Sequence, residues 1–170
     1  SISSSGNTVN INQSTKRAVI DWRSFNIAAD EKTVFNQPSS KSVTLNRVNS
    51  ADPSQIMGTM SANGNVILIN PNGVFFTKTA TVDVNGLIAT TADIKNHKFM
   101  SGDLHFSKTG NPNASVVNEG TITAKDAGLD LIGWSLERDG PLHKGGGFYH
   151  RSIKAAIDRD GDGPLVLECD

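Results

Sequence analysis

The segment VILINPNGVFF, residues 66–76, places the tetrapeptide Asn70-Pro71-Asn72-Gly73 between two runs of bulky apolar side chains. Asn at the first position, Pro at the second and Gly at the fourth are typical of a type I turn. Asn70 can bond to the turn backbone, Pro71 restricts φ, and Gly73 tolerates a left-handed exit. None of the four side chains can ionise, so the motif predicts a structural corner and excludes a catalytic group.

The apolar runs on either side of this turn, Val66–Ile69 and Val74–Phe76, are continuous. Such runs are typical of strands that are covered on both faces. Almost nothing before residue 125 has the period of an amphipathic helix, which predicts an all-β body. The other expected strands are rich in β-branched or aromatic residues and lie in TVNINQS, RAVIDWRSFNI, KTVFNQ, SVTLNRV, QIMGTM and ATVDVNGLIATT.

Three segments of this body share an Asn, then a Gly, then alternating β-branched residues, which indicates a stacked repeat. Asn63 and Asn85 are 22 residues apart, which fits one rung of a β-solenoid. Asn85 and Asn118 are 33 apart, which fits one rung plus an insertion, for which KNHKFMSGDLHFSKTGNPN is the candidate. The three segments are ANGNVILI (62–69), VNGLIATT (84–91) and VNEGTITA (117–124).

A solenoid predicts equivalent environments for Asn63 and Asn85, and Asn side chains that form hydrogen-bonded ladders between rungs. At this period, residues 1–133 would make about six rungs, with open strand edges at both ends unless they are capped. A β-sandwich shows much of the same pattern and is the alternative fold.

Composition divides the chain in two. All 16 asparagines lie between Asn7 and Asn118, and the net charge is +3 over residues 1–118 but −4 over residues 119–170. We therefore expect an Asn-rich β-domain over 1–133 and an atypical Gly/Asp-rich tail over 134–170.

The same composition excludes several classes of function. A net charge of −1 and 19% charged residues give no electrostatic case for nucleic acid or an acidic membrane. No apolar run is long enough to insert in a membrane, and SISSSGNTV lacks the regions of a signal peptide. The only cysteine, Cys169, cannot form an intramolecular disulfide.

Two long stretches carry a family resemblance: STKRAVIDWRSFNIAADEKTVFNQPSSKSVTLNRV and SQIMGTMSANGNVILINPNGVFFTKTATVDVNGLIATTADI. They resemble the N-terminal secretion domain, or haemagglutination-activity domain, of two-partner-secreted exoproteins of the filamentous haemagglutinin-like and high-molecular-weight adhesin type. The likeness runs from about Thr8 to Gly133, where ASVVNEGTITAKDAGLDLIG is similar to a last rung. The match is specific because many positions agree in order, whereas the tetrapeptide alone would be weak.

The resemblance implies a right-handed parallel β-helix with an N-terminal cap, at the front of a very long bacterial surface adhesin or haemagglutinin. It implies a partner outer-membrane transporter, whose POTRA domains recognise the domain in the periplasm before export to the cell surface or medium. The full-length protein would then meet the host-cell surface. No catalytic residue, cofactor or metal is implied, so the chain is not expected to be an enzyme.

The family's Asn-Pro-Asn-Gly motif falls on Asn70, Pro71, Asn72 and Gly73, which are the implied transporter-recognition turn. Its second motif, Asn-Pro-Asn-Leu, has its nearest match at residues 111–114, NPNA, which departs at the last place. We expect strand addition by the transporter and rung-by-rung folding outside the cell to favour outward movement.

Other functions have weaker support. A β-helical carbohydrate-active enzyme or glycan-binding module is the alternative, but it needs clustered charges, and the seven acidic residues of 1–118 are scattered. In DRDGDG, Asp158, Asp160 and Asp162 fit the start of a calcium loop, but Cys169 occupies the place of its final Glu. His97 and His105 are read as surface residues, and Trp22 and Phe25 as core residues rather than a sugar platform.

Overall fold

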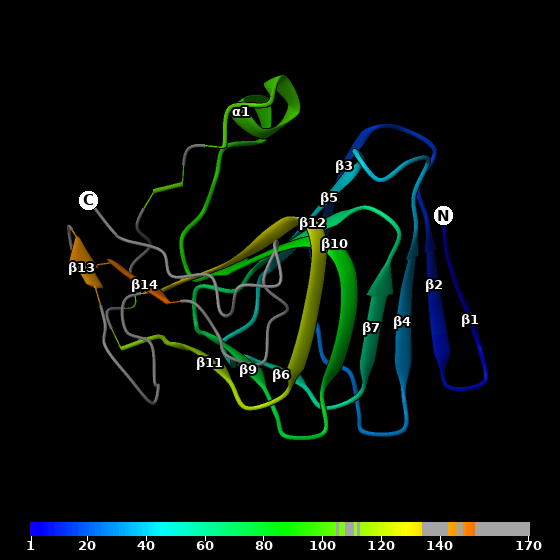
Figure 1. The fold of residues 1–170 in the computed structure, drawn as a ribbon, viewed down its shortest axis with the longest axis horizontal. Helices are drawn as coiled ribbons and strands as arrows, with labels where there is room; N and C mark the ends of the chain where they lie inside the picture. The colour runs from blue at the N-terminus through cyan, green and yellow to red at the C-terminus, as the bar shows by residue number, and fades with distance from the viewer. Residues whose placement is uncertain (105, 108–110, 112, 134–142, 146–147, 152–170) are drawn as a thin grey trace.

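The structure is a computed structural model that describes residues 1–104, 106–107, 111, 113–133, 143–145 and 148–151. Its parallel strands form three sides of a coil, and the first two sides belong to one continuous sheet because two long strands run through both. On the side that we call face one, five parallel strands lie side by side (Figure 1). They are β2 (Thr8–Asn12), β4 (Lys32–Asn36), β7 (Thr59–Ala62) and the first halves of β10 (Thr81–Thr90) and β12 (Thr121–Gly133).

Face two repeats this arrangement with the next segment of each turn. Its strands are β3 (Arg17–Trp22), β5 (Val43–Val48), β8 (Asn65–Ile69) and the second halves of β10 and β12. The strands β10 and β12 serve both faces, and the register between them shifts from Val84 to Gly86, where the chain bends from one face to the other.

Face three is narrower and consists of β6 (Ser54–Ile56), β9 (Val74–Phe76) and β11 (Val116–Asn118), all parallel. An isolated bridge from Ile27 to Ile56 continues it by one residue toward the N-terminus. The chain thus visits faces one, two and three in order and repeats, which makes the fold a parallel β-helix, as predicted, and excludes the β-sandwich.

The number of turns is smaller than the expected six. In the described part of the chain, three turns have a strand on every face, with a partial turn at each end. The count was wrong because the turns differ in length: Ser54 pairs with Val74, 20 residues on, whereas Val74 pairs with Val116, 42 residues on. The longer turn contains the predicted insertion.

The repeat was only partly assigned correctly. Residues 63 and 85 lie at the same corner, between faces one and two, because Asn85 N–H donates to Gly64 O at 3.0 Å. Asn118, however, lies at the corner between faces three and one, where Glu119 N–H donates to Phe76 O. The segment around Asn118 is therefore not a third copy of the corner that contains Asn63 and Asn85. Asn followed closely by Gly occurs at either corner, because neighbouring turns of the coil come into close contact at both. A Cβ added to Gly64 would lie 2.8 Å from Gln37 Oε1, and one added to Gly120 would lie 2.6 Å from Thr77 O.

The four apolar residues of β8 are all buried, which confirms that this strand is covered on both sides. Val66 and Leu68 belong to the cluster inside the coil, while Ile67 and Ile69 belong to a second cluster outside face two. The insertion covers that second cluster with Ile94 and Phe99. Phe99 lies on the only helix of the described residues, α1 (Asn96–Ser101), which ends at Gly102 with φ 88°.

The ends of the coil differ from its middle. At the N-terminus, β1 (Ile2–Ser5) pairs antiparallel with β2, which confirms the predicted cap. At the other end, β12 pairs antiparallel with β14 (Phe148–Arg151), which also pairs with β13 (His143–Gly145). Antiparallel strands at these edges interrupt the parallel stacking of turns.

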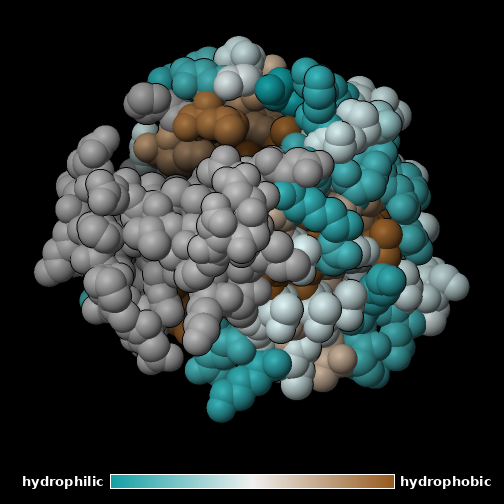
Figure 2. Space-filling model, in the orientation of Figure 1, coloured by the Kyte–Doolittle hydropathy of each residue, from teal (hydrophilic) through white to brown (hydrophobic). Residues whose placement is uncertain are grey.

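Among the side chains coloured in Figure 2 most are hydrophilic, and hydrophobic ones gather in the region of α1. Met100 and Leu104, on and beside that helix, are about half exposed, at 52% and 47%. Among the described residues, no helix has the length and apolar character needed to span a membrane.

Candidate functional site

The motif turn connects β8 on face two to β9 on face three, and we call Asn70–Gly73 the NPNG corner. The predicted turn is confirmed, since Gly73 N–H donates to Asn70 O at 3.0 Å and Asn72 N–H donates to Asn70 Oδ1 at 2.9 Å. Gly73 has φ +117°, a conformation that disfavours any residue with a side chain. A Cβ there would also lie 2.8 Å from Ser115 O.

Asn70 anchors this corner from inside the protein. Its side chain is fully buried, and its Nδ2 donates to Asp52 O and Ser54 Oγ, both at 3.1 Å. Its backbone N–H donates to Thr90 O on the following turn. The Nδ2 and backbone N–H of Asn70 therefore join neighbouring turns of the coil, while its two oxygens hold the corner itself. The side chain is not available to a partner while the coil is folded.

Asn72 lies nearer the surface and joins three successive turns. Its Nδ2 donates to Ser50 O at 2.6 Å, and its Oδ1 accepts from Asn111 Nδ2 at 3.0 Å. Pro71 and Asn72 are partly exposed, whereas Asn70 and Gly73 are buried. Only the two middle residues of the motif therefore present surface to a partner.

The β-turn of the NPNG corner recurs in the rung before it and in the rung after it. Ser50 Oγ accepts from Asp52 N–H at 3.0 Å, as Asn70 Oδ1 accepts from Asn72 N–H. Asn111 Oδ1 accepts from Asn113 N–H at 3.0 Å, so the second motif candidate forms a turn that is stacked directly on the first. Asx-type and Ser-type turns of this kind satisfy the backbone without help from a sheet. We call this stack of three turns the corner column.

A groove of about 280 Å³ runs beside the corner column, over the outer side of face three. The side chains of Gln55, Phe75 and Val117 occupy matching register positions along it. Phe75 is partly exposed, so the prediction that both apolar runs are covered on both sides holds for β8 but is wrong for β9. The groove is lined by Pro53, Gln55, Asn72, Val74, Phe75, Asn113, Ser115 and Val117.

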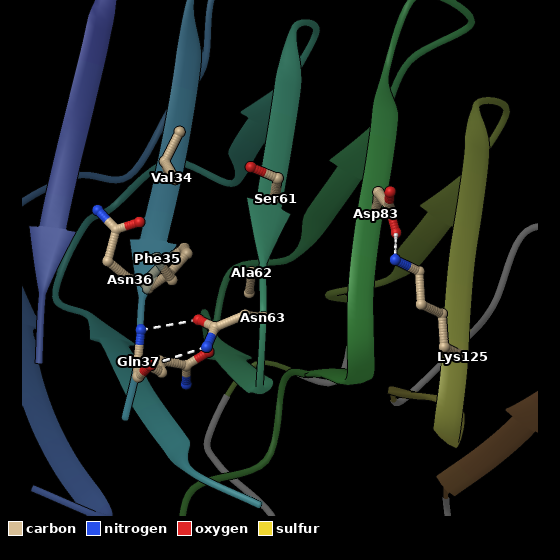
Figure 3. Close-up of a pocket in the computed structure, with 9 residues that line it drawn as sticks. All are labelled: Val34, Phe35, Asn36, Gln37, Ser61, Ala62, Asn63, Asp83 and Lys125. Carbon is tan, nitrogen blue, oxygen red and sulfur yellow. Dashed lines mark hydrogen bonds and ion pairs between the residues drawn. The ribbon is translucent and has the colours of Figure 1, made fainter. Parts of the chain in front are cut away.

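A second, polar hollow of about 410 Å³ lies on the outer side of face one (Figure 3). Asp83 and Lys125 form an ion pair of 3.1 Å across it, and both side chains are more than half exposed. An exposed pair of this kind contributes little to stability. This hollow has a single carboxylate, from Asp83, so it lacks the pair of acidic groups that glycoside hydrolysis requires.

Asparagine ladders join the turns, as predicted. Asn36 Nδ2 donates to Asn12 Oδ1 at 2.9 Å, and Asn85 Nδ2 donates to Asn65 Oδ1 at 3.2 Å. The environments of Asn63 and Asn85 are similar but not identical. Asn63 bonds reciprocally to the backbone of Gln37, whereas Asn85 reaches Ser40 O.

Sequence reasoning did not identify Arg47, which fastens the insertion to face two. Its Nε donates to Asp93 at 2.9 Å, its Nη1 to Asp21 at 3.1 Å and its Nη2 to Ile94 O at 2.7 Å. Burial lowers the pKa of Arg47, but the hydrogen bonds and charges of Asp93 and Asp21 outweigh this and raise it above its ordinary value. The partners lie 26 and 46 residues away, so no local sequence signal marks them.

The remaining candidates do not form a site. Trp22 and Phe25 pack edge to face with ring centroids 5.3 Å apart and contribute to the interior, so the core interpretation is confirmed. His97 is exposed on α1, and no metal-binding group of His, Cys, Asp or Glu occurs among the described residues. His105 and the DRDGDG segment, with Asp158, Asp160 and Asp162, lie outside them.

Known proteins similar to this chain include a family model, a solved structure and three longer relatives. The family model of the TPS secretion domain matches residues 1–152. Among solved structures, the crystal structure of the HMW1 secretion domain from Haemophilus influenzae matches with a TM-score of 0.72 and 35% sequence identity. That match covers 77% of this chain and 36% of the other.

Curated relatives are much longer than this chain. A heme/hemopexin-binding protein of Haemophilus influenzae is 38% identical over 141 residues, which are 74% of this chain but 15% of that protein. Another heme/hemopexin-binding protein of this species is 42% identical over 98 residues, 58% of this chain and 11% of the relative. An extracellular protein of Arthroderma benhamiae is 51% identical over 53 residues, 29% of this chain and 22% of the relative.

Proposed function

The chain belongs to the TPS secretion domain family, and from that premise we propose that its corner column is the feature that a partner outer-membrane transporter recognises. Membership makes the chain a secretion-targeting domain of an exported protein and implies such a transporter. The family is not an enzyme family, and the comparisons give no support to a carbohydrate-active enzyme. The involvement of POTRA domains and of Asn70, Pro71, Asn72 and Gly73 is the proposal.

The observation that carries this proposal is the unequal exposure within the motif. Asn70 and Gly73 are buried and are required for the turn, while Pro71 and Asn72 are partly exposed beside the groove on face three. A partner that reads the motif in the folded state therefore contacts Pro71 and Asn72. A partner that reads it earlier meets the extended strands that flank it, and can pair with them by strand addition.

Folding outside the cell would then make export directional. Each turn of the coil buries its apolar side chains against its neighbours, and the cap formed by β1 and β2 supplies the first edge. Folding of each exported turn would therefore favour outward movement. We further propose that the larger protein carrying this domain acts at the host-cell surface as an adhesin.

The test is secretion of the chain in cells that make its cognate transporter, with cells lacking the transporter as the baseline. We expect the double variant Pro71→Ala/Asn72→Ala to reach the medium at about a tenth of the wild-type level or less, because it alters both exposed residues of the motif. The matched control is Asn63→Ala, which removes two hydrogen bonds at a different corner.

The comparison separates recognition from folding. If the purified double variant and Asn63→Ala lose similar stability in urea, but only the double variant loses secretion, the motif is read by the transporter. Equal secretion of the two variants would show instead that the motif acts only through the stability of the coil.

A further inference from the structure

Three asparagines of the chain, Asn63, Asn72 and Asn85, are followed directly by glycine. In such a step the backbone nitrogen of glycine can attack the Cγ of the asparagine side chain, because no Cβ restricts the approach. The new N–Cγ bond forms as the Cγ–Nδ2 bond breaks, and the leaving NH₂ group takes up the proton of the glycine N–H and departs as ammonia, which gives a cyclic succinimide. Water then opens the ring to aspartate or isoaspartate, so water is the only co-reactant and nothing is oxidised or reduced.

The fold itself requires glycine after two of these asparagines, Asn63 and Asn72. A Cβ on Gly64 would lie 2.8 Å from each of Gln37 Oε1, Ser39 O and Ser42 O. Gly73 combines a φ of +117° with a similar obstruction by Ser115 O. Neither position therefore accepts a side chain that would slow the reaction.

The fold also requires the asparagine. Asn63 accepts from Gln37 N–H at 2.8 Å and donates to Gln37 O at 2.7 Å, and an ionised aspartate cannot replace it because a carboxylate has no donor. Asn72 likewise donates to Ser50 O and accepts from Asn111, and Asn85 donates to Ser40 O and to Asn65 Oδ1. The reactive pair is thus a consequence of the way in which the turns are joined.

The folded state holds both reacting groups away from the reaction. Gly64 N–H donates to Gln37 Oε1 at 2.8 Å, and Gly73 N–H donates to Asn70 O at 3.0 Å. Gly86 lies in the parallel ladder between Asn65 and Gly128. The side-chain amide of each asparagine is fixed by the bonds above, so attack requires the corner to open first.

We propose that Asn63, Asn72 and Asn85 are sites of spontaneous deamidation in the unfolded chain, and that folding of the coil switches the reaction off. The product is incompatible with the corner. Aspartate at position 72 places a carboxylate against Ser50 O, and aspartate at 63 does the same against Gln37 O. Isoaspartate adds a backbone atom and so lengthens the turn that Gly73 N–H closes on Asn70 O. The time that a chain spends unfolded therefore limits the fraction that can still fold.

The test follows modification at each site by peptide mass spectrometry after incubation of the 170-residue chain at mildly alkaline pH, folded in buffer or unfolded in concentrated urea. In urea we expect the three sites to gain the mass of the NH₂-to-OH exchange faster than Asn10, Asn46 and Asn96, which precede Ile, Arg and His. In buffer we expect modification at the three sites to be about a hundredfold slower than in urea.

Each outcome bears on the proposal. Equal rates in buffer and urea would overturn protection by the fold, and rates in urea no faster than at Asn10 would overturn the sites themselves. The effect of the product is tested with Asn72→Asp, which we expect to unfold at lower urea than wild type, against Asn113→Asp at an exposed position of the same corner column. Equal stability of these two variants would show that the product fits the corner. All of these measurements are made without a transporter, so their failure would overturn the deamidation proposal without affecting the proposed function.

Discussion

Asn70 is the residue of the corner column whose loss we expect to be most damaging. Substitution Asn70→Ala removes the donor to Asp52 O and Ser54 Oγ and the acceptor for Asn72 N–H; the bond to Ser54 is buried and the other two are partly buried. Leaving buried polar groups without partners costs about 1–3 kcal/mol each, so we expect a loss of about 3 kcal/mol in the free energy of unfolding. Urea titration monitored by tryptophan fluorescence measures it.

The control for this prediction is Asn72→Ala, whose side chain is partly exposed and whose partners can bond to water instead. We expect a loss of about 1 kcal/mol there. A larger loss for Asn72→Ala than for Asn70→Ala would contradict the assignment of Asn70 as the anchor.

Gly120 tests how closely the turns approach at the corner between faces three and one. A Cβ at this position would lie 2.6 Å from Thr77 O and 2.7 Å from Ala80 O, so the backbone of one turn must move to accept it. We expect Gly120→Ala to cost about 1–3 kcal/mol, as overpacking does in a close-packed interior. The same urea titration measures the change, and a midpoint equal to that of wild type would show that the corner has room.

At the scale of elements, the insertion is held by two different kinds of contact. Phe99 and Ile94 cover the apolar outer side of face two, while Arg47 bonds to Asp93 and to the backbone of Ile94. The segment also closes on itself, because Asp93 and Ser107 exchange both backbone hydrogen bonds. The insertion is therefore a small unit that can open without unfolding the coil.

This arrangement predicts the effect of Arg47→Met, which keeps the length of the side chain but removes its charge and donors. We expect the amides of Asp93 and Ser107 to exchange with deuterium about tenfold faster, while amides of β5 and β8 keep their protection. Hydrogen exchange followed by mass spectrometry measures this, with Arg23→Met, an exposed arginine, as the control. Uniform loss of protection across the coil would contradict local opening.

The ion pairs of Arg47 with Asp93 and Asp21 have a defined pH dependence. Because the pKa of Arg47 is raised in the folded state, its contribution is complete below the unfolded pKa and is lost only as pH rises through the higher folded value. That range lies far above neutrality, so we expect the exchange rate of the insertion, corrected for intrinsic chemistry, to be unaffected by titration of Arg47 between about pH 6 and pH 9. Wild type should exchange more slowly than Arg47→Met at every pH in this interval. If that difference disappeared between about pH 6 and pH 9, the prediction would be wrong.

The elements differ in how well the sequence predicts them. The burial of β8 on both sides could be read from Val66–Ile69, because an uninterrupted apolar run has no side to present to water. The presence of an insertion could be read from the spacing of asparagines, but not that its own Phe99 would cover face two. Asn118 was placed at the wrong corner because Asn and Gly serve both corners alike. Arg47 was missed because its partners are distant in sequence, and the transporter-recognition role of the NPNG corner and the division at residue 133 stay predictions.

At the scale of the whole molecule, the coil has almost no local pairing. The parallel strand pairs of the described residues join segments about 20 to 42 residues apart. Each turn gains stability only after its neighbour is in place, because its apolar side chains face the shared interior. Such a topology folds as a stack of turns, which supports the proposal that the chain folds after export.

We therefore expect slow folding, on a timescale of about seconds, when the chain is diluted from urea, since non-local parallel pairing must overcome loop-closure entropy before contacts form. Stopped-flow tryptophan fluorescence measures the rate, and a double-jump experiment separates any phase due to proline isomerisation. Removal of residues 1–7, which deletes β1 and leaves the edge of β2 open, should slow folding further if the cap supplies the first edge. Folding in under a millisecond would contradict this account of the topology, and an unchanged rate after the deletion would show that the coil begins to form at another turn.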